Sequence, residues 1–113
     1  MRVLVCGGRN YNDYETARRV LDSLQPSVII EGGARGADSL GARYAKENGR
    51  DLHTFHALWN RYGRRAGPER NGRMLQEGTP DLVLAFPGGR GTANMVKLAK
   101  EAGVKVIEIE SRN

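Results

Sequence analysis

The sequence predicts an α/β protein: a Rossmann-like three-layer sandwich whose five-stranded, mainly parallel sheet has the strand order 3-2-1-4-5. Short runs of Val, Ile and Leu alternate with longer segments of helical periodicity along the 113 residues, and this is the pattern of consecutive βαβ units. The central runs are continuously apolar, as expected for parallel strands that helices cover on both faces. Because no linker, internal repeat or low-complexity tract interrupts the pattern, we expect one domain over residues 1–113.

Five short apolar runs are interpreted as the strands of this sheet. They are rich in β-branched residues and are bounded by Gly, Pro or charged residues, as strands usually are. The third run is the weakest of the five. The expected strands cover residues 3–6, 28–30, 52–55, 82–86 and 104–109.

The first two helices are predicted from apolar positions that share one face. The first begins at Tyr14, after which apolar residues recur every three or four positions. Asn12, with an acidic residue three positions later, is expected to cap its start, and Pro26 is expected to stop it. The second helix is expected over residues 37–48, with Gly49 as its C-terminal stop.

The second half of the chain begins with a stretch that has no clean period. Residues 56–67 contain the only tryptophan and three arginines, and a loop of this length in a small domain is usually functional or mobile. A helix over residues 68–77 is expected to follow, with Pro68 in its first turn and Gly78 at its end. The last helix is expected over residues 92–102.

Composition excludes several classes of protein. The single cysteine, Cys6, cannot form an internal disulfide or anchor a cysteine-rich zinc site, and His53 and His56 lack a partner at metal-ligand spacing. We therefore expect no metal and no cofactor, with Cys6 in the core. The sequence has no apolar run long enough for a signal peptide or a membrane span, so we expect a cytoplasmic protein that does not interact with membranes.

The balance of charge favours an anionic partner. The net charge is +5, and 14 of the 18 basic residues are arginine. The planar guanidinium group suits phosphate and carboxylate ligands. A GC-rich genome would also raise the content of both Arg and Gly, so composition alone does not separate the two explanations.

Glycines are concentrated where three of the expected strands end. Glycine lets a ligand approach the backbone closely, and the helix that follows each loop offers unpaired N–H groups. Because the carboxyl ends of parallel strands share one edge, the three loops should line the same rim. Each loop also carries one arginine. The loops are Gly7-Gly8-Arg9, Gly32-Gly33-Ala34-Arg35-Gly36-Ala37-Asp38 and Pro87-Gly88-Gly89-Arg90-Gly91-Thr92.

None of these loops matches a standard nucleotide fingerprint. The second reads G-G-x-x-G rather than G-x-G-x-x-G, and none ends in G-K-[ST]. An ordinary NAD site and a P-loop NTPase are therefore disfavoured. An anion site built from two or three converging loops is still consistent with the sequence.

Two of the loops, PGGRGT and GGARGAD, resemble the SLOG superfamily, the Rossmann-like fold shared by LOG-type proteins and the DNA-processing protein DprA. A further segment runs from Trp59 through Ala66-Gly67-Pro68-Glu69-Arg70-Asn71 to Met74. Followed by AFPGGRGTANM, it is similar to the YspA-like branch, long described as a domain of unknown function. The resemblance covers about residues 1–110 and implies a pocket for a nucleotide or nucleotide derivative at the carboxyl edge of the sheet.

The resemblance also bears on catalysis. In LOG-type enzymes, which cleave the N-glycosidic bond of nucleoside 5′-monophosphates, acidic residues follow PGGxGT and an arginine precedes it on a helix. Arg70 matches that arginine, but Asn94 and Met95 stand where a carboxylate would be needed. Cleavage through an oxocarbenium-like state requires such a carboxylate, so Asp38 and Arg70 are only weak catalytic candidates.

Four residues outside the glycine positions are further candidates for the site. Asp38 either contacts a ribose hydroxyl or base, or merely favours the helix N-terminus. Trp59 either stacks on a base or buries its own loop. Arg70 and Asn71 are placed at a helix start, where the helix dipole disfavours arginine, so a compensating anion is expected there.

Three functions are therefore carried forward. The first is a sensor or sequestering module that binds a nucleotide or nucleotide-derived ligand, and the second is a LOG-type nucleotide hydrolase. The third is single-stranded DNA binding, as in DprA, which five arginines among residues 59–73 favour and the low aromatic content of 6% disfavours. We also expect a homodimer, since SLOG relatives often pair. The residues expected to bind the ligand are Gly7, Gly8, Arg9, Gly32, Gly33, Ala34, Arg35, Gly36, Asp38, Trp59, Arg70, Asn71, Pro87, Gly88, Gly89, Arg90, Gly91 and Thr92.

Overall fold

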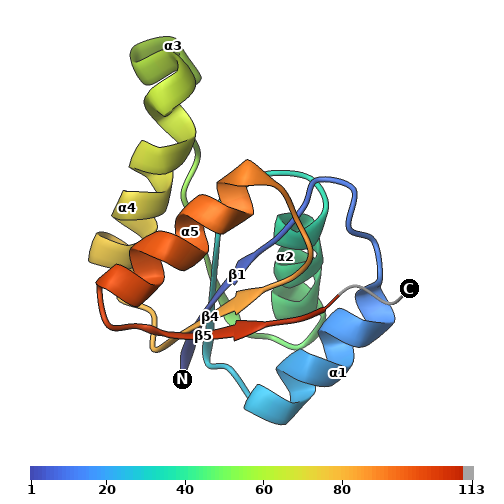
Figure 1. The fold of residues 1–113 in the computed structure, drawn as a ribbon. Helices are drawn as coiled ribbons and strands as arrows, with labels where there is room; N and C mark the ends of the chain where they lie inside the picture. Colours follow the sequence, from blue (N-terminus) through green and yellow to red (C-terminus); the bar gives the residue numbers. More distant parts are fainter. Residues whose placement is uncertain (111–113) are drawn as a thin grey trace.

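A computed structural model describes residues 1–110 of the chain. Its five strands form one sheet in the order β3-β2-β1-β4-β5, and all four neighbouring pairs are parallel. The predicted fold class and strand order are confirmed (Figure 1). The strands are β1 (Arg2–Cys6), β2 (Val28–Glu31), β3 (Asp51–Thr54), β4 (Leu82–Ala85) and β5 (Lys105–Glu108).

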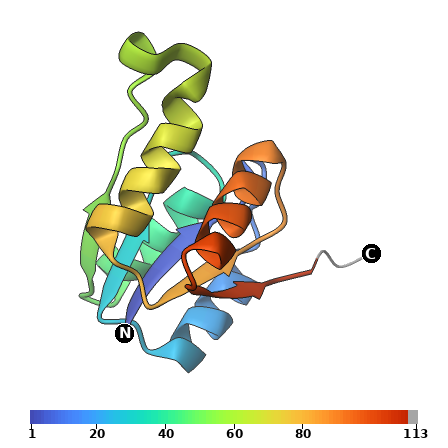
Figure 2. The ribbon, with the colours of Figure 1, turned by 60° about the vertical axis from the view of Figure 1, so that its left-hand side comes forward.

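Four helices cover the two faces of the sheet. Two of them, α1 and α2, pack on one face, and α4 and α5 pack on the other (Figures 1 and 2). A short helix and one turn of 3-10 helix precede α4, and they extend beyond the sheet together with its first turns (Figure 2). The helices are α1 (Tyr14–Leu24), α2 (Ala37–Glu47), α3 (Trp59–Tyr62), the 3-10 turn η1 (Gly63–Arg65), α4 (Ala66–Gly78) and α5 (Arg90–Glu101).

The continuous apolar runs of the central strands supply two cores. In β1, Val3 and Val5 pack toward Leu21 of α1 and Tyr44 of α2, whereas Leu4 packs toward the opposite face with the helices α4 and α5. Successive side chains of a strand point to opposite faces, so an uninterrupted apolar run can fill both layers. This explains why the three-layer arrangement could be predicted.

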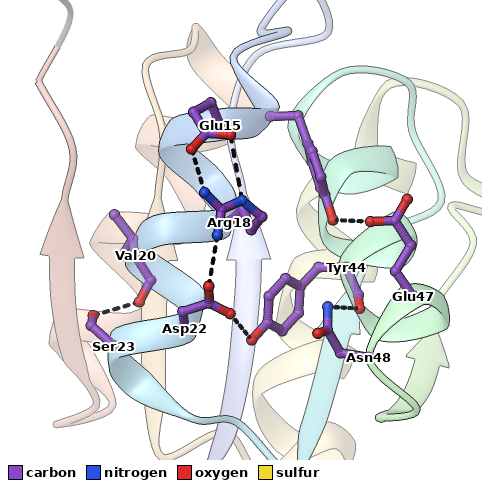
Figure 3. A network of polar contacts seen from close by, with 9 residues as sticks. Glu15, Arg18, Val20, Asp22, Ser23, Tyr44, Glu47 and Asn48 are labelled. Carbon is purple, nitrogen blue, oxygen red and sulfur yellow. Dashed lines mark hydrogen bonds and ion pairs between the residues drawn. The ribbon is translucent and has the colours of Figure 1, made fainter.

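Polar contacts at the outer surface join α1 to α2 (Figure 3). The hydroxyl group of Tyr44 donates a hydrogen bond to Asp22 at 2.8 Å, and Arg18 donates to Asp22 and to Glu15. The ring of Tyr44 lies in the core below. The contact therefore satisfies the one polar atom of a large buried side chain.

The start of α1 differs from the prediction by one residue. Asp13, rather than Asn12, is the N-cap, and its carboxylate accepts hydrogen bonds from the backbone N–H and the hydroxyl group of Thr16. Asp and Asn are both good N-cap residues, so the preference of the residue types did not separate two adjacent candidates.

The segment between β3 and β4 contains the largest departure from the prediction. Residues 56–67 were expected to form a loop, but α3 and η1 lie within them, and α4 begins at Ala66 rather than at residue 68. Turns of three or four residues are too short to show an apolar period. The end of α4 also differs, because Gly78 is the last helical residue and Thr79 adopts the left-handed conformation with φ of 46°.

The remaining boundaries agree with the prediction to within two residues. Helix α5 begins at Arg90, two residues before the expected start, so Gly91 and Thr92 belong to its first turn. Gly49 and Gly103 follow the ends of α2 and α5 with φ of 62° and 75°, as expected for C-terminal stops. Within residues 1–110, no helix has both the length and the apolar character needed to span a membrane.

Glycine is required by the fold itself at Gly36. Its φ is 82°, and a Cβ atom there would lie 2.2 Å from the carbonyl oxygen of Gly8 and 2.5 Å from the backbone of Arg9. By contrast, a Cβ atom at Gly72 in α4 would meet nothing within 4 Å among the described residues outside the backbone of its own helix. The same substitution should therefore have opposite effects at these two positions.

We expect Gly36→Ala to destabilise the protein by at least about 2 kcal/mol, through backbone strain and a backbone clash. Gly72→Ala should stabilise it by about 0.5–1 kcal/mol, because alanine is the better helix former. Urea denaturation of the two variants beside the wild type measures both effects. Equal stability of the two variants would contradict this account of the loop.

Candidate functional site

A cleft of about 980 Å³ lies at the carboxyl edge of the sheet. The loops after β1, β2 and β4 form its base, and η1 and the first turns of α4 form one wall. Its size is at the upper end of the range of small-molecule sites. Of the residues predicted to bind a ligand, all line this cleft except Gly36, Pro87 and Gly88.

The backbone of Gly8 connects the three loops. Its N–H donates to the carbonyl oxygen of Pro87 at 2.9 Å, and its own carbonyl oxygen accepts from the N–H groups of Ala37 at 3.1 Å and Tyr11 at 3.2 Å. The loop after β1 is thereby held between the loop before α5 and the start of α2. These bonds hold the three loops together at one edge of the sheet, where the sequence predicted that they would converge.

The glycines of the rim fall into two groups. At Gly7 and Gly88, a Cβ atom would lie within 3 Å of atoms in a neighbouring loop, so these glycines let the loops approach one another. At Gly89 and Gly91, a Cβ atom would meet nothing within 4 Å among residues 1–110 outside the backbone of α5. Packing within this part of the chain does not require a glycine at these two positions, and both line the cleft. They therefore leave room for a ligand beside the start of α5.

Two buried carboxylates hold the loop after β2. Glu31, which is 3% exposed, accepts a hydrogen bond from the N–H of Gly33 at 2.6 Å and another from the hydroxyl group of Thr54. Asp38, which is 7% exposed, accepts from the N–H groups of Gly32 at 3.1 Å and Ala34 at 3.2 Å, both through Oδ2. Three successive amides that were expected to face a ligand are thus bound by the protein's own acids.

Asp38 retains one oxygen atom for the cleft. Its Oδ1 has no hydrogen-bond partner among residues 1–110, and no buried side-chain oxygen or nitrogen in that range lacks a partner, so Oδ1 is open to the cleft that Asp38 lines. Burial, together with the nearby charge of Glu31, raises the pKa of Asp38 to about 6, although the two amides and Arg70 oppose the rise. The carboxyl group therefore titrates close to neutral pH.

Arg70 and Asn71 do not lie at a helix start, as the sequence predicted. They occupy the second turn of α4, because that helix begins at Ala66. Arg70 donates to the carbonyl oxygen of Gly32 at 2.7 Å and to Asn71 Oδ1 at 3.1 Å. The expected conflict with the helix dipole is therefore absent, and Arg70 instead joins α4 to the loop after β2.

The side chain of Asn71 is used within the protein. It is buried, and its Nδ2 donates to the carbonyl oxygen of Gly91 at 3.2 Å and to Asn94 Oδ1 at 2.9 Å. Asn71 thus fixes the start of α5 against α4. Met95, the next residue, lies fully in the core, so neither Asn94 nor Met95 brings a carboxylate or a free polar group to the cleft.

The N-terminus of α5 leaves a run of backbone N–H groups unpaired at this edge. No side chain caps it, and within residues 1–110 no acceptor takes the N–H groups of the five residues from Gly88 to Thr92. The first N–H groups of a helix carry a partial positive charge and bind anions readily. Gly89, Arg90, Gly91 and Thr92 line the cleft beside these amides.

Trp59 lies at the outer wall of the cleft. It belongs to α3, is 52% exposed, and its ring edge would be 3.8 Å from a Cβ atom at Gly67. Its indole is therefore half free rather than buried under its own loop, and it lines the cleft.

Several lining residues were not predicted to be part of the site. Arg64, Gly67, Pro68 and Met74 lie in the segment that carries the family resemblance, and its spacing could have indicated them. His56 lies over Gly33, where its Nδ1 would be 2.6 Å from a Cβ atom. Glu31 could have been noticed as an acid that ends an apolar strand just before Gly32-Gly33. The lining residues missed are Cys6, His56, Ala57, Arg64, Gly67, Pro68 and Met74.

Cys6 lies at the end of β1 in the core beneath the cleft. Burial raises the pKa of its thiol to about 12, and the carboxylate of Asp38 raises it further than Arg70 lowers it. The thiolate is therefore not formed near neutral pH, and a core residue is the better interpretation. In the described part of the chain, no group of three or more His, Cys, Asp or Glu side chains is placed to hold a metal ion.

Comparison with known proteins agrees with the motifs. A sequence model of the YspA, cpYpsA-related SLOG family matches residues 1–62. The chain belongs to this family. Gene 61 protein of Mycobacterium phage D29 is 39% identical to it over 118 residues, and the match covers 94% of both chains. The family match includes the loops after β1 and β2, and the similarity to the phage protein extends through α4 and α5.

The raised pKa of Asp38 makes a prediction about stability and pH. The folded state holds the proton more tightly than the unfolded state, so the contribution of Asp38 to stability falls as pH rises from about 4 to about 6. The variant Asp38→Asn can keep the hydrogen bonds to the loop without this charge. Its stability relative to wild type should rise by about 1–3 kcal/mol between pH 4 and pH 7.

Urea denaturation at a series of pH values measures this difference. Asp51→Asn removes an exposed carboxylate of β3 outside the cleft, and its difference from wild type should stay within about 0.5 kcal/mol. If the difference between Asp38→Asn and wild type were the same at every pH, the assigned titration of Asp38 would be wrong.

Proposed function

We propose that the cleft binds a nucleotide or nucleotide-derived ligand, so that the protein acts as a sensor or sequestering module. The observation that carries the proposal is the start of α5, where the helix end is uncapped and five successive amides have no acceptor among residues 1–110. Four of these five residues, Gly89 to Thr92, line the cleft, and Arg90 is one of them. The free amides and Arg90 lack hydrogen-bond acceptors and a negative charge to pair with. A phosphate group offers both, since it carries several oxygen atoms and negative charge.

The rest of the cleft suits the other parts of a nucleotide. Asp38 Oδ1 can accept a hydrogen bond from a ribose hydroxyl, and the half-exposed indole of Trp59 offers a face for a base. Membership of a SLOG family supports the same class of ligand. The argument for a nucleotide is nevertheless made from the residues of this chain. Binding, rather than turnover, is the primary proposal because Asn94 and Met95 provide no carboxylate.

Titration calorimetry with AMP and with adenosine tests the proposal. AMP should bind and adenosine should bind at least about tenfold more weakly, because the phosphate makes the charge-assisted contacts. Arg90→Gln should weaken AMP binding by a similar factor. The matched control is Arg50→Gln, which removes an exposed arginine outside the cleft and should leave the affinity unchanged.

Two results would contradict the proposal. One is the absence of binding and of thermal stabilisation with any of the four common nucleoside 5′-monophosphates. The other is equal weakening of AMP binding by Arg90→Gln and Arg50→Gln. The affinity for AMP would then depend on the overall charge of the protein rather than on contacts at the start of α5.

Asp38 supports a second candidate function, hydrolysis of the N-glycosidic bond of a nucleotide. It is a carboxyl group with a pKa of about 6 and with one oxygen open to the cleft. Such a group can orient water or stabilise an oxocarbenium-like transition state. The structure offers no other carboxylate that lines the cleft among residues 1–110.

For this second function, incubation of the wild type with AMP should release free adenine and ribose 5-phosphate, which chromatography separates. Asp38→Asn should reduce the rate at least about 100-fold while AMP still binds. No release of base by the wild type over long incubation would leave the protein a binding module. A rate that Asp38→Asn leaves unchanged would exclude Asp38 as the catalytic carboxylate.

A further inference from the structure

The arginines of this protein fall into two groups by their partners. On the helix surfaces, Arg18, Arg43 and Arg73 each pair with a carboxylate one turn away on the same helix. The arginines that line the cleft differ, because none of them forms an ion pair with a carboxylate in the described part of the chain. They are Arg9, Arg35, Arg64, Arg70 and Arg90.

This grouping concentrates positive charge at one place. Asp38 is the only acidic side chain among the lining residues of the described chain, and it faces five arginines there. A single phosphate carries at most two negative charges at neutral pH. The cleft is therefore built with more cationic groups than one phosphate group neutralises.

The strand order sets out these cations in a row. The loops that carry Arg90, Arg9 and Arg35 follow β4, β1 and β2, which are adjacent strands in that order. Neighbouring strands lie about 4.8 Å apart, so the two outer loops of the three are on the order of 10 Å apart at their bases. The row is longer than one phosphate group and comparable to a chain of two or three.

Two of the cations are close enough to repel each other. The pKa of Arg70 is lowered chiefly by burial; the carboxylates of Asp38 and Glu31 oppose this, and the positive charges of Arg73 and Arg9 add to it. Arg9 extends from the loop after β1, and Arg70 extends from α4 and donates to the loop after β2. The cleft therefore gathers cationic groups from separate elements of the fold.

The amides divide along the same row. Those at the start of α5 are free, whereas those of Gly32, Gly33 and Ala34 are occupied by Glu31 and Asp38. At these three positions an anion meets no free amide, and Arg9 and Arg35 are the exposed cations of the two loops that meet there. The first phosphate uses the amides of α5, and the second uses these arginines.

We infer that the ligand carries at least two linked phosphate groups, as in a nucleoside diphosphate or a larger nucleotide polyphosphate. One phosphate lies on the amides of α5 beside Arg90, and the next lies between Arg9 and Arg35. This inference rests on the proposed nucleotide site and states which class of nucleotide that site selects.

The test compares AMP, ADP and ATP by titration calorimetry at fixed ionic strength. ADP should bind at least about tenfold more tightly than AMP, because a second set of charge-assisted contacts is added. Arg9→Gln and Arg35→Gln should each weaken ADP binding about tenfold or more and change AMP binding less than about threefold. Arg50→Gln is again the matched control, since all three substitutions remove one exposed positive charge.

The outcomes separate this inference from the proposed function. If AMP binds with the dependence on Arg90 described above but ADP and ATP bind no more tightly, the inference is overturned and the proposed function stands. If no nucleotide binds, both are wrong. Equal effects of Arg9→Gln on AMP and ADP would also overturn the inference, because Arg9 would then contact the first phosphate.

Two further probes identify the part of the ligand that is recognised. Inorganic pyrophosphate should compete with ADP but bind more weakly, since it lacks the base and ribose. A single-stranded oligothymidylate should compete poorly, because its phosphates are separated by sugars rather than linked. If the oligothymidylate bound more tightly than ATP, the row of arginines would serve a nucleic-acid strand and the inference would be overturned.

Discussion

The geometry of the cleft depends on three hydrogen bonds made by the backbone of Gly8. Two of them connect the loop after β1 to Pro87 and to Ala37, and the third, from Tyr11, closes a turn within that loop. The contacts are possible only because Gly7, Gly36 and Gly88 have no side chains at the points where the loops touch. Half of the eight glycines in these loops therefore serve the approach of one loop to another, which in turn sets the positions of Arg9, Arg35 and Arg90.

Most of the fold could be predicted because the central strands are apolar on both faces and because Gly49 and Gly103 mark the ends of α2 and α5. The uninterrupted apolar runs at β1 and β4 permit only a sheet covered on both sides. The segment from α3 to the start of α4 could not be predicted, because turns of three or four residues have no apolar period. The exact start of α1 could not be predicted either, because Asn12 and Asp13 are adjacent and either residue type can cap a helix.

The position of the candidate site followed from topology, whereas its chemistry did not. Parallel strands bring their carboxyl ends to one edge, so the three glycine loops were expected to meet. Which amides remain free is a tertiary property: Glu31 and Asp38 fold back on the loop after β2, and Arg70 reaches its carbonyl oxygen from another helix. No local pattern separates the occupied amides of this loop from the free amides of α5.

The bonds of Gly8 also determine when the cleft can form during folding. They join β1, at the beginning of the chain, to the segment after β4, near its end, and contacts between such distant segments close late. A chain in which β4 has not yet paired with β1 lacks both the anchored loop and the start of α5. A ligand that requires all three loops therefore binds only the completed fold, and its binding free energy adds wholly to the stability of that state.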